Sequence, residues 1–387
     1  MIPYARQYIS NQDINFVKKI LKSEYLTSGP TTIKFEKKVA KYCNIKFSVA
    51  TNSGTSALHV ACLSLGLKKG DYAWTSPISF VASSNCALYC GAKIDFVDID
   101  PSTFNISINA LKKKLVIAKK ENKLPKVLIP VHLGGLSCDM LEIKDLAKKF
   151  KFKIIEDASH AIGGRYRDKP IGNCKYSDIT VFSFHPVKII TSAEGGMALT
   201  NNKELANKMT MFRNNGITKD KKKMKSHNNK PWYYEQLELG YNYRLSDVHS
   251  ALGLSQLNKI DIFTKKRNYL SKIYDKELKK LNIKFQENLN NSYSSKHLYI
   301  CRVPESKRKK IIYHLSKKNI KTNLHYIPIY KHPFYRQLGF KSYKIKNAEK
   351  YYKEALTLPL YYSLSLKDQK KVIKILRKAL ETKENEK

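Results

Sequence analysis

The sequence predicts an α/β protein with a large domain on a mixed sheet and a smaller α+β domain toward the C-terminus. Three observations support this fold class. Short apolar strands alternate with helices over the first 257 residues, polar or glycine-bearing turns follow several strands, and the pattern changes after residue 257. We therefore expect a large domain over 1–257, with an N-terminal arm over about 1–25, and a small domain over 258–387.

Each element follows from a local pattern of apolar residues and turn signals. Short runs rich in β-branched and aromatic residues predict strands, whereas longer segments with one apolar face predict helices. The expected strands are 47–50, 72–75, 94–97, 127–131, 152–155, 179–183, 197–200, 284–285 and 299–303. The expected helices are 56–67, 80–89, 141–150, 247–257, 258–278 and 309–320.

The net charge of +40 comes almost entirely from lysine, since only ten of the 72 basic residues are arginine. The lysines are spread along the whole chain, so we interpret them as a solvated surface rather than a nucleic-acid footprint. A polyanion-binding role stays open as the alternative. A positive field would also attract a diphosphate-bearing substrate.

The first residues and the cysteine usage favour a cytoplasmic protein. The first residues carry no apolar signal run, and no stretch approaches the roughly 18 apolar residues of a membrane span. The seven cysteines are odd in number and form no CxxC pair, which favours reduced thiols. We expect a cytoplasmic enzyme with no membrane association and no metal site.

A lysine and an aspartate follow two of the apolar strands. Lys188 stands five residues after Ser183, which ends the strand 179–183, and Asp157 closely follows the expected strand 152–155. In parallel sheets such ends meet at one edge, where ligands bind. A lysine that forms a Schiff base and an aspartate that keeps a pyridine nitrogen protonated are what pyridoxal 5'-phosphate (PLP) requires. Lys188 and Asp157 are the predicted catalytic residues.

A phosphate group needs a cradle, and the turn at Gly54 and Thr55 offers one. This turn opens an apolar helix, whose first N–H groups bind anions, and a glycine allows close approach. The alternative is a plain helix cap made by Ser53 or Thr55. The presence of Lys188 and Asp157 favours the phosphate site.

Two further residues are candidates for the same pocket. Phe80 could stack on the pyridine ring, although a core aromatic is the alternative. His160 could line the pocket or hydrogen-bond Asp157, and a structural histidine is equally compatible. A third cluster, Tyr241 to Asp247, combines a helix start at Ser246 with polar side chains that could meet an anion.

The order of these motifs resembles the DegT-type sugar aminotransferases, which have the fold type I of PLP-dependent transferases (aspartate-aminotransferase-like). The resemblance runs nearly end to end. It includes Thr27-Ser28-Gly29-Pro30, the 52–58 turn, Glu156-Asp157-Ala158-Ser159-His160-Ala161, the 183–188 segment, Arg213-Asn214-Asn215-Gly216-Ile217 and the 240–247 cluster. It implies PLP bound to Lys188, and phosphate contacts from Gly54, Thr55 and Ser183. It also implies a homodimer in which Asn242 reaches the partner's site.

A finer resemblance is to the pseudaminic-acid branch of that family. It rests on Pro231-Trp232-Tyr233-Tyr234-Glu235, on the 183–196 segment and on His325-Tyr326-Ile327-Pro328-Ile329. That branch implies amination at C4 of a UDP-linked 4-keto-6-deoxy-N-acetylhexosamine, with glutamate as donor. Candidate substrate-binding residues are Tyr4, Arg6, His325 and Tyr326.

Three alternatives stay open at this point. The first is an aminotransferase for a different keto nucleotide sugar, acting at C3 or giving another C4 epimer. The second is a sugar dehydratase, but those relatives carry histidine where this chain has Lys188. The third is a non-catalytic regulatory protein on the same fold, which the intact set of Lys188, Asp157 and Ser183 argues against.

Overall fold

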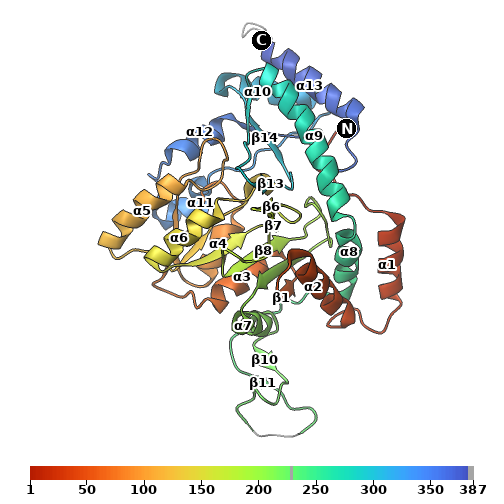
Figure 1. Ribbon diagram of the computed structural model, residues 1–387, viewed down its shortest axis with the longest axis vertical. Helices are drawn as coiled ribbons and strands as arrows, with labels where there is room; N and C mark the ends of the chain where they lie inside the picture. Colours follow the sequence, from red (N-terminus) through yellow and green to blue (C-terminus); the bar gives the residue numbers. More distant parts are fainter. Residues whose placement is uncertain (227–229, 382–387) are drawn as a thin grey trace.

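The computed structural model describes residues 1–226 and 230–381, and its centre is a seven-stranded sheet (Figure 1). Four strand pairs are parallel, and one strand, β9, runs antiparallel to both of its neighbours. The predicted large mixed sheet is thus confirmed. In spatial order the strands are β1 (Phe47–Thr51), β9 (Gly196–Thr200), β8 (Ile179–Ser183), β5 (Lys153–Asp157), β4 (Val127–Ile129), β2 (Tyr72–Thr75) and β3 (Lys93–Phe96).

Helices pack on both faces of this sheet because its strands are apolar on both sides. Along β5, Ile155 packs in a cluster with residues of α3, α4 and α7, whereas Ile154 packs with residues of α5 and α6. Successive side chains of a strand point to opposite faces, so both helix layers follow from adjacent apolar residues. The helices of this region are α1 (Asn11–Leu21), α2 (Pro30–Cys43), α3 (Gly54–Ser64), α4 (Ala82–Tyr89), α5 (Ile108–Lys120), α6 (Met140–Phe150), α7 (Lys203–Arg213) and α8 (Asp247–Leu257), with a 3-10 turn η1 (Leu133–Gly135).

Two helix starts differ from the sequence prediction near the predicted site. The helix expected over 56–67 begins at Gly54, because the Ser53 hydroxyl caps it by accepting a hydrogen bond from the N–H of Ser56. The helix expected over 80–89 begins at Ala82, which leaves Phe80 in the preceding loop. The first shift makes Gly54 and Thr55 the first residues of α3, and the second leaves Phe80 outside α4.

The C-terminal region forms its own layer around a three-stranded antiparallel sheet. Its core includes Leu270 and Tyr274 of the long helix α9 and Val372 and Leu376 of the last helix. The elements are α9 (Ile260–Lys280), β12 (Lys284–Phe285), β14 (Tyr299–Arg302), α10 (Glu305–Lys317), η2 (Ile329–Lys331), α11 (Pro333–Tyr335), η3 (Arg336–Phe340), α12 (Lys346–Glu354), β15 (Ala355–Leu358) and α13 (Leu366–Glu381). The domain limits at 257 and 258 stay a prediction, and 382–387 lie outside the described residues.

Two small sheets complete the structure. One is the hairpin of β10 (Ile217–Thr218) and β11 (Glu235–Gln236), which projects from the end of the molecule farthest from α13 (Figure 1). The other pairs β6 (Arg165–Tyr166) with β7 (Lys169–Pro170) and with β13 (Ser292–Tyr293). The second sheet therefore ties the large sheet region to the chain segment that follows α9.

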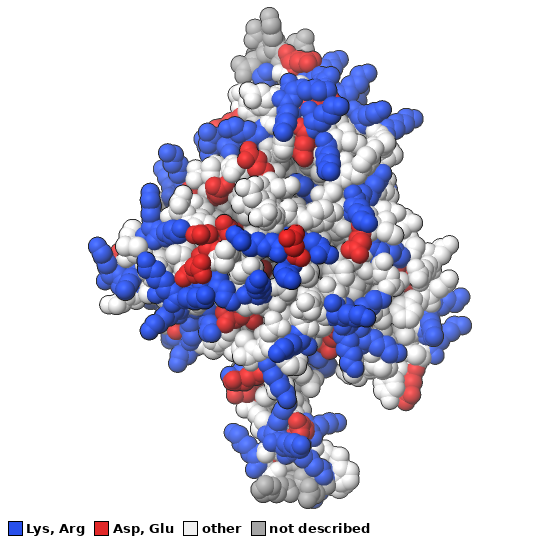
Figure 2. All heavy atoms as spheres, viewed as in Figure 1, with Lys and Arg blue, Asp and Glu red and all other residues white. Residues whose placement is uncertain are grey.

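Basic side chains are scattered over the visible face of the molecule, with acidic and uncharged side chains between them (Figure 2). This distribution agrees with the dispersed lysines of the sequence. All seven cysteines are free thiols. Among the helices of the described residues, none combines the length and apolar character that a membrane crossing requires.

Candidate active site

A pocket of about 360 Å³ opens where β1, β5 and β8 of the large sheet end. Its walls come from these strand ends, from the segment before α4, from the N-terminal segment, and from the C-terminal region. Ten of the twelve site residues predicted from sequence line it: Tyr4, Gly54, Thr55, Phe80, Asp157, His160, Ser183, Lys188, His325 and Tyr326.

Lys188 lies in the loop that follows β8, and its backbone N–H donates to the carbonyl of His185 at 2.9 Å. Other protein atoms bury part of the Lys188 side chain. Burial lowers the pKa of Lys188 to about 8, and the negative charge of Asp157 opposes this shift. A useful fraction of the amine is therefore neutral at physiological pH, as a nucleophile and base must be.

Asp157 is the last residue of β5, and both of its carboxylate oxygens accept hydrogen bonds. The Ser83 hydroxyl donates to Oδ2 at 2.6 Å, and the Ser159 hydroxyl donates to Oδ1 at 2.6 Å. Ser83 is in turn within 2.6 Å of the Ser79 hydroxyl. These contacts fix the orientation of the carboxylate at the floor of the pocket. The predicted contact between Asp157 and His160 is not among them.

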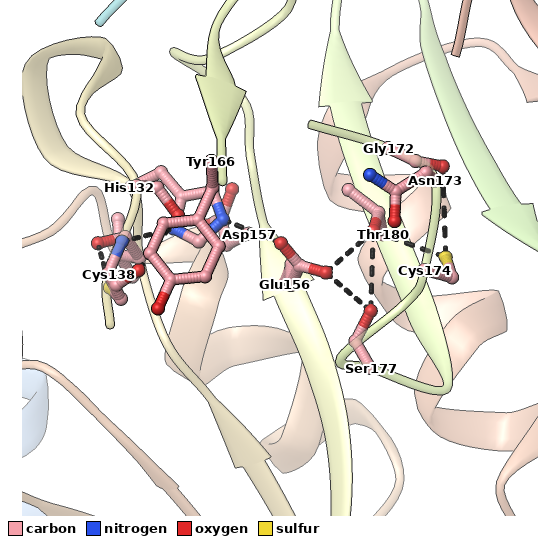
Figure 3. A network of polar contacts seen from close by, with 12 residues as sticks. His132, Cys138, Glu156, Asp157, Tyr166, Gly172, Asn173, Cys174, Ser177 and Thr180 are labelled. Carbon is pink, nitrogen blue, oxygen red and sulfur yellow. Dashed lines mark hydrogen bonds and ion pairs between the residues drawn. The ribbon is translucent and has the colours of Figure 1, made fainter. Parts of the chain in front are cut away.

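Glu156 immediately precedes Asp157 and therefore points to the opposite face of the sheet (Figure 3). It accepts hydrogen bonds from His132 Nε2 at 2.7 Å, from Ser177 at 2.5 Å and from Thr180 at 3.1 Å. Burial alone would raise the pKa of Glu156, but these donors lower it below its ordinary value. The network holds β5 against its neighbours and so supports the position of Asp157.

The N-terminus of α3 meets the end of β8 at very close range. A Cβ on Gly54 would lie 2.9 Å from the Cβ of Ser183, and a Cβ on Gly196 would lie 2.2 Å from the carbonyl oxygen of Ser53. Only glycine fits at either position without movement. The close approach brings the first N–H groups of α3 and the Ser183 hydroxyl to one place, which suits a phosphate group.

Aromatic and imidazole rings line the side of the pocket that faces the C-terminal region. Phe80 is 58% exposed and lies 6.3 Å from Tyr326, centroid to centroid. A large aromatic ring this exposed beside a pocket is not a core residue, so the alternative of a buried Phe80 is wrong. His160 is buried and lies against His297, with ring centroids 4.5 Å apart.

The sequence reasoning missed several residues of this pocket. His297 and Asn323 line it from the C-terminal region, and Ser83 holds Asp157. His297 and Asn323 are far from the strand-end motifs in sequence, and no local pattern places them there. Ser83 did carry a signal, because Ser79, just before α4, and Ser83, in its first turn, are four residues apart and their hydroxyls share a hydrogen bond.

Two predicted residues lie outside the pocket. Arg6 is exposed and is not part of the lining. Asn242 is also exposed, and its backbone pairs with Asn214 while its carbonyl accepts from Asn52 Nδ2 at 3.5 Å. Arg6 was assigned with the pocket-lining Tyr4, but the two side chains do not share an environment. A role for Asn242 in the pocket of its own chain is not supported.

Comparison with known proteins identifies the family. Residues 7–377 match the model of the DegT/DnrJ/EryC1/StrS aminotransferase family. The chain belongs to this family. It is 39% identical to the UDP-4-amino-4,6-dideoxy-N-acetyl-beta-L-altrosamine transaminase of Campylobacter jejuni strain 81-176, over 98% of each chain. The predicted family, the fold class and the aminotransferase activity are therefore confirmed.

Solved structures of this family agree with that assignment. PseC of Helicobacter pylori, an aminotransferase of pseudaminic acid biosynthesis, superposes with a TM-score of 0.88 at 31% identity and covers 98% of this chain and 99% of its own. A sugar aminotransferase of Streptococcus pneumoniae, solved in a PMP form and a PLP form, gives TM-scores of 0.89 and 0.87 at 28% identity. These alignments cover 98% of this chain and 98–99% of the other chains.

The pocket fits a PLP molecule on its own geometry. Lys188 supplies an amine of lowered pKa, Asp157 supplies a fixed carboxylate, and the contact between Gly54 and Ser183 supplies a cradle that a side chain would fill. The three features lie in one pocket. They correspond to the reactive aldehyde, the ring nitrogen and the phosphate of the cofactor.

Proposed function

We propose that this protein is a PLP-dependent aminotransferase that moves an amino group from glutamate to C4 of a UDP-linked 4-keto-6-deoxy-N-acetylhexosamine. The observation that carries the proposal is the grouping of Lys188, Asp157 and the Gly54–Ser183 cradle in one pocket. The choice of sugar is supported by the 39% identity to the Campylobacter jejuni enzyme and by the likeness to PseC. We expect the reaction to serve pseudaminic acid biosynthesis in the cytoplasm.

Some pocket residues would transfer protons, and others would orient the cofactor. Bound PLP would supply an electron sink that stabilises negative charge at the carbon losing its proton. Lys188, once neutral, takes the proton from the α-carbon of glutamate and later delivers a proton to C4 of the sugar. Asp157, held by Ser83 and Ser159, keeps the ring nitrogen protonated. Phe80 has a free face on which the ring can stack.

The protein is proposed to act as a homodimer with shared sites. Asn242 is exposed and lies outside the lining of its own pocket, so it is free to reach a phosphate in a second subunit. The family resemblance assigns the same role to this asparagine. We propose no specific nucleic-acid partner, because basic side chains are dispersed over the visible face and form no single strip (Figure 2).

The deciding experiment supplies purified enzyme with PLP, glutamate and the UDP-linked 4-keto sugar. The expected product has the mass of the amino sugar, and NMR should place the new C–N bond at C4 with 2-oxoglutarate formed in equal amount. Lys188→Ala serves as the inactive control. Amination at C3, or activity only with another keto nucleotide sugar, would support the aminotransferase activity and contradict the proposed substrate.

A further inference from the structure

The ring of His160 has a defined tautomer, because a backbone amide fixes one of its nitrogens. The N–H of Gly134 donates to His160 Nδ1 at 3.3 Å, so this nitrogen must carry a lone pair. Gly134 lies in the turn η1, where the N–H of Leu133 donates to Asn105 Oδ1 and the Leu133 carbonyl accepts from Gln286 Nε2. A neutral His160 therefore carries its hydrogen on Nε2. Burial and the positive charge of Lys188 lower its pKa, which keeps the ring neutral.

This tautomer sets the direction of the next hydrogen bond. His160 Nε2 lies 3.2 Å from the hydroxyl of Tyr326, and the nitrogen is the donor. A phenolic hydrogen stays near the plane of its ring, where it has two positions. The position toward His160 is taken by the imidazole N–H, so the hydroxyl hydrogen must point the other way. Within the described part of the chain, the Tyr326 hydroxyl has no second hydrogen-bond partner.

The free hydrogen lies beside the reaction centre. Tyr326 lines the same pocket as Lys188, and its ring faces Phe80. Lys188 is close enough to His160 and His325 for its charge to affect both rings. The two carboxylate oxygens of Asp157 already accept from serines. The natural acceptor for Tyr326 is therefore on the ligand that occupies the pocket.

We propose that Tyr326 donates a hydrogen bond to an oxygen of the bound ligand beside the carbon that exchanges the amino group, and that His160 positions this donor. The proposal rests on the proposed aminotransferase function. Two oxygens have the required chemistry: the phenolic oxygen of PLP and an oxygen of the keto sugar next to C4. His160 is a positioning residue, since it acts through Tyr326 and through the amide of Gly134.

Three variants separate this role from simple packing. Tyr326→Phe removes the donor and keeps the ring. His160→Gln keeps an N–H toward Tyr326, whereas His160→Met fills similar space without a donor. Tyr274→Phe is the matched control, because its hydroxyl donates to the carbonyl of Pro359 at 3.0 Å in the core of the C-terminal region, away from the pocket. Thermal melting of each cofactor-free variant reports whether it folds.

The readouts distinguish the two oxygens and test the proposal itself. If the acceptor is on PLP, Tyr326→Phe shifts the visible band of the resting enzyme and weakens PLP binding by about 10-fold. If it is on the sugar, the resting spectrum and the glutamate half-reaction stay as in wild type. The half-reaction with the keto sugar then slows by about 10-fold. Either result supports a donor at Tyr326, whereas wild-type values for the visible band, for PLP binding and for the keto-sugar half-reaction together overturn it.

The His160 variants test whether His160 orients the Tyr326 hydroxyl. His160→Gln should behave as wild type, and His160→Met should reproduce the defect of Tyr326→Phe. A His160→Met enzyme that folds and matches wild type would refute the positioning role. If the wild-type enzyme does not aminate the UDP-linked 4-keto sugar but loses its visible absorbance band with glutamate, the proposed substrate is wrong and the aminotransferase activity stands. The comparison of Tyr326→Phe with wild type then proceeds on whichever keto sugar is accepted.

Discussion

The pKa of Lys188 makes the assembly of the active enzyme depend on pH in a predictable way. An ordinary lysine has a pKa of 10.5, and burial lowers that of Lys188 to about 8. At pH 7 the neutral fraction of the amine is then roughly 10%, against about 0.03% for an ordinary lysine, a gain of about 300-fold. Only the neutral amine attacks an aldehyde. We therefore expect rapid linkage of PLP to cofactor-free enzyme at neutral pH.

The assay follows the visible band of the linked cofactor after PLP is mixed with cofactor-free protein between pH 6 and pH 10. The rate should rise with pH and level off with an apparent pKa of about 8. Asp157→Asn should lower this pKa further, because Asp157 opposes the effect of burial. Free lysine under the same conditions corrects for the titration of PLP, and Lys188→Ala should give no band. An apparent pKa near 10.5, or a rise in Asp157→Asn, would refute the reasoning.

Three further outcomes are expected. Gly54→Ala should weaken PLP binding by about 5- to 150-fold in a fluorescence titration, because the new methyl group meets Ser183 at 2.9 Å and overpacking costs about 1–3 kcal/mol. Unchanged affinity would contradict a phosphate cradle at Gly54. Glu156→Gln should lose about 1–3 kcal/mol of unfolding free energy in urea at pH 7. The lowered pKa of Glu156 means that this difference is present above the unfolded value of about 4.3 and shrinks as the pH falls below it. Mixed dimers of Lys188→Ala and Asn242→Ala should recover activity, since one site of each would hold both intact residues. No recovery after verified subunit exchange would contradict a shared site.

The sequence predicted the parts of the site that depend on strand ends. Asp157 and Ser183 could be placed together because each ends an apolar strand of a parallel pair, and the structure puts both in the pocket. Gly54 could be assigned because a glycine in the turn that opens a helix lets an anion come close to the first backbone N–H groups. These inferences use only local sequence and the geometry of a sheet.

The remaining residues could not be placed because their positions depend on the packing of distant segments. His297 and Asn323 reach the pocket only because the C-terminal region folds back over the sheet. Arg6 is close to Tyr4 in sequence, yet only Tyr4 turns inward. The tautomer of His160 depends on the backbone amide of Gly134, 26 residues earlier in the chain. Such contacts between distant residues produce no periodic pattern in the sequence.

The adjacent acids of β5 show how one strand serves both stability and chemistry. Glu156 and Asp157 point to opposite faces, and each carboxylate receives its own set of donors. The donors to Glu156 include His132 and Thr180 of the neighbouring chain segments, so this carboxylate fixes the register of β5 where the strand ends. In the proposed function Asp157 needs that rigidity, because a carboxylate that is to keep a ring nitrogen protonated has to stay beside it. A substitution at Glu156 should therefore reduce cofactor binding as well as stability, although its side chain does not line the pocket.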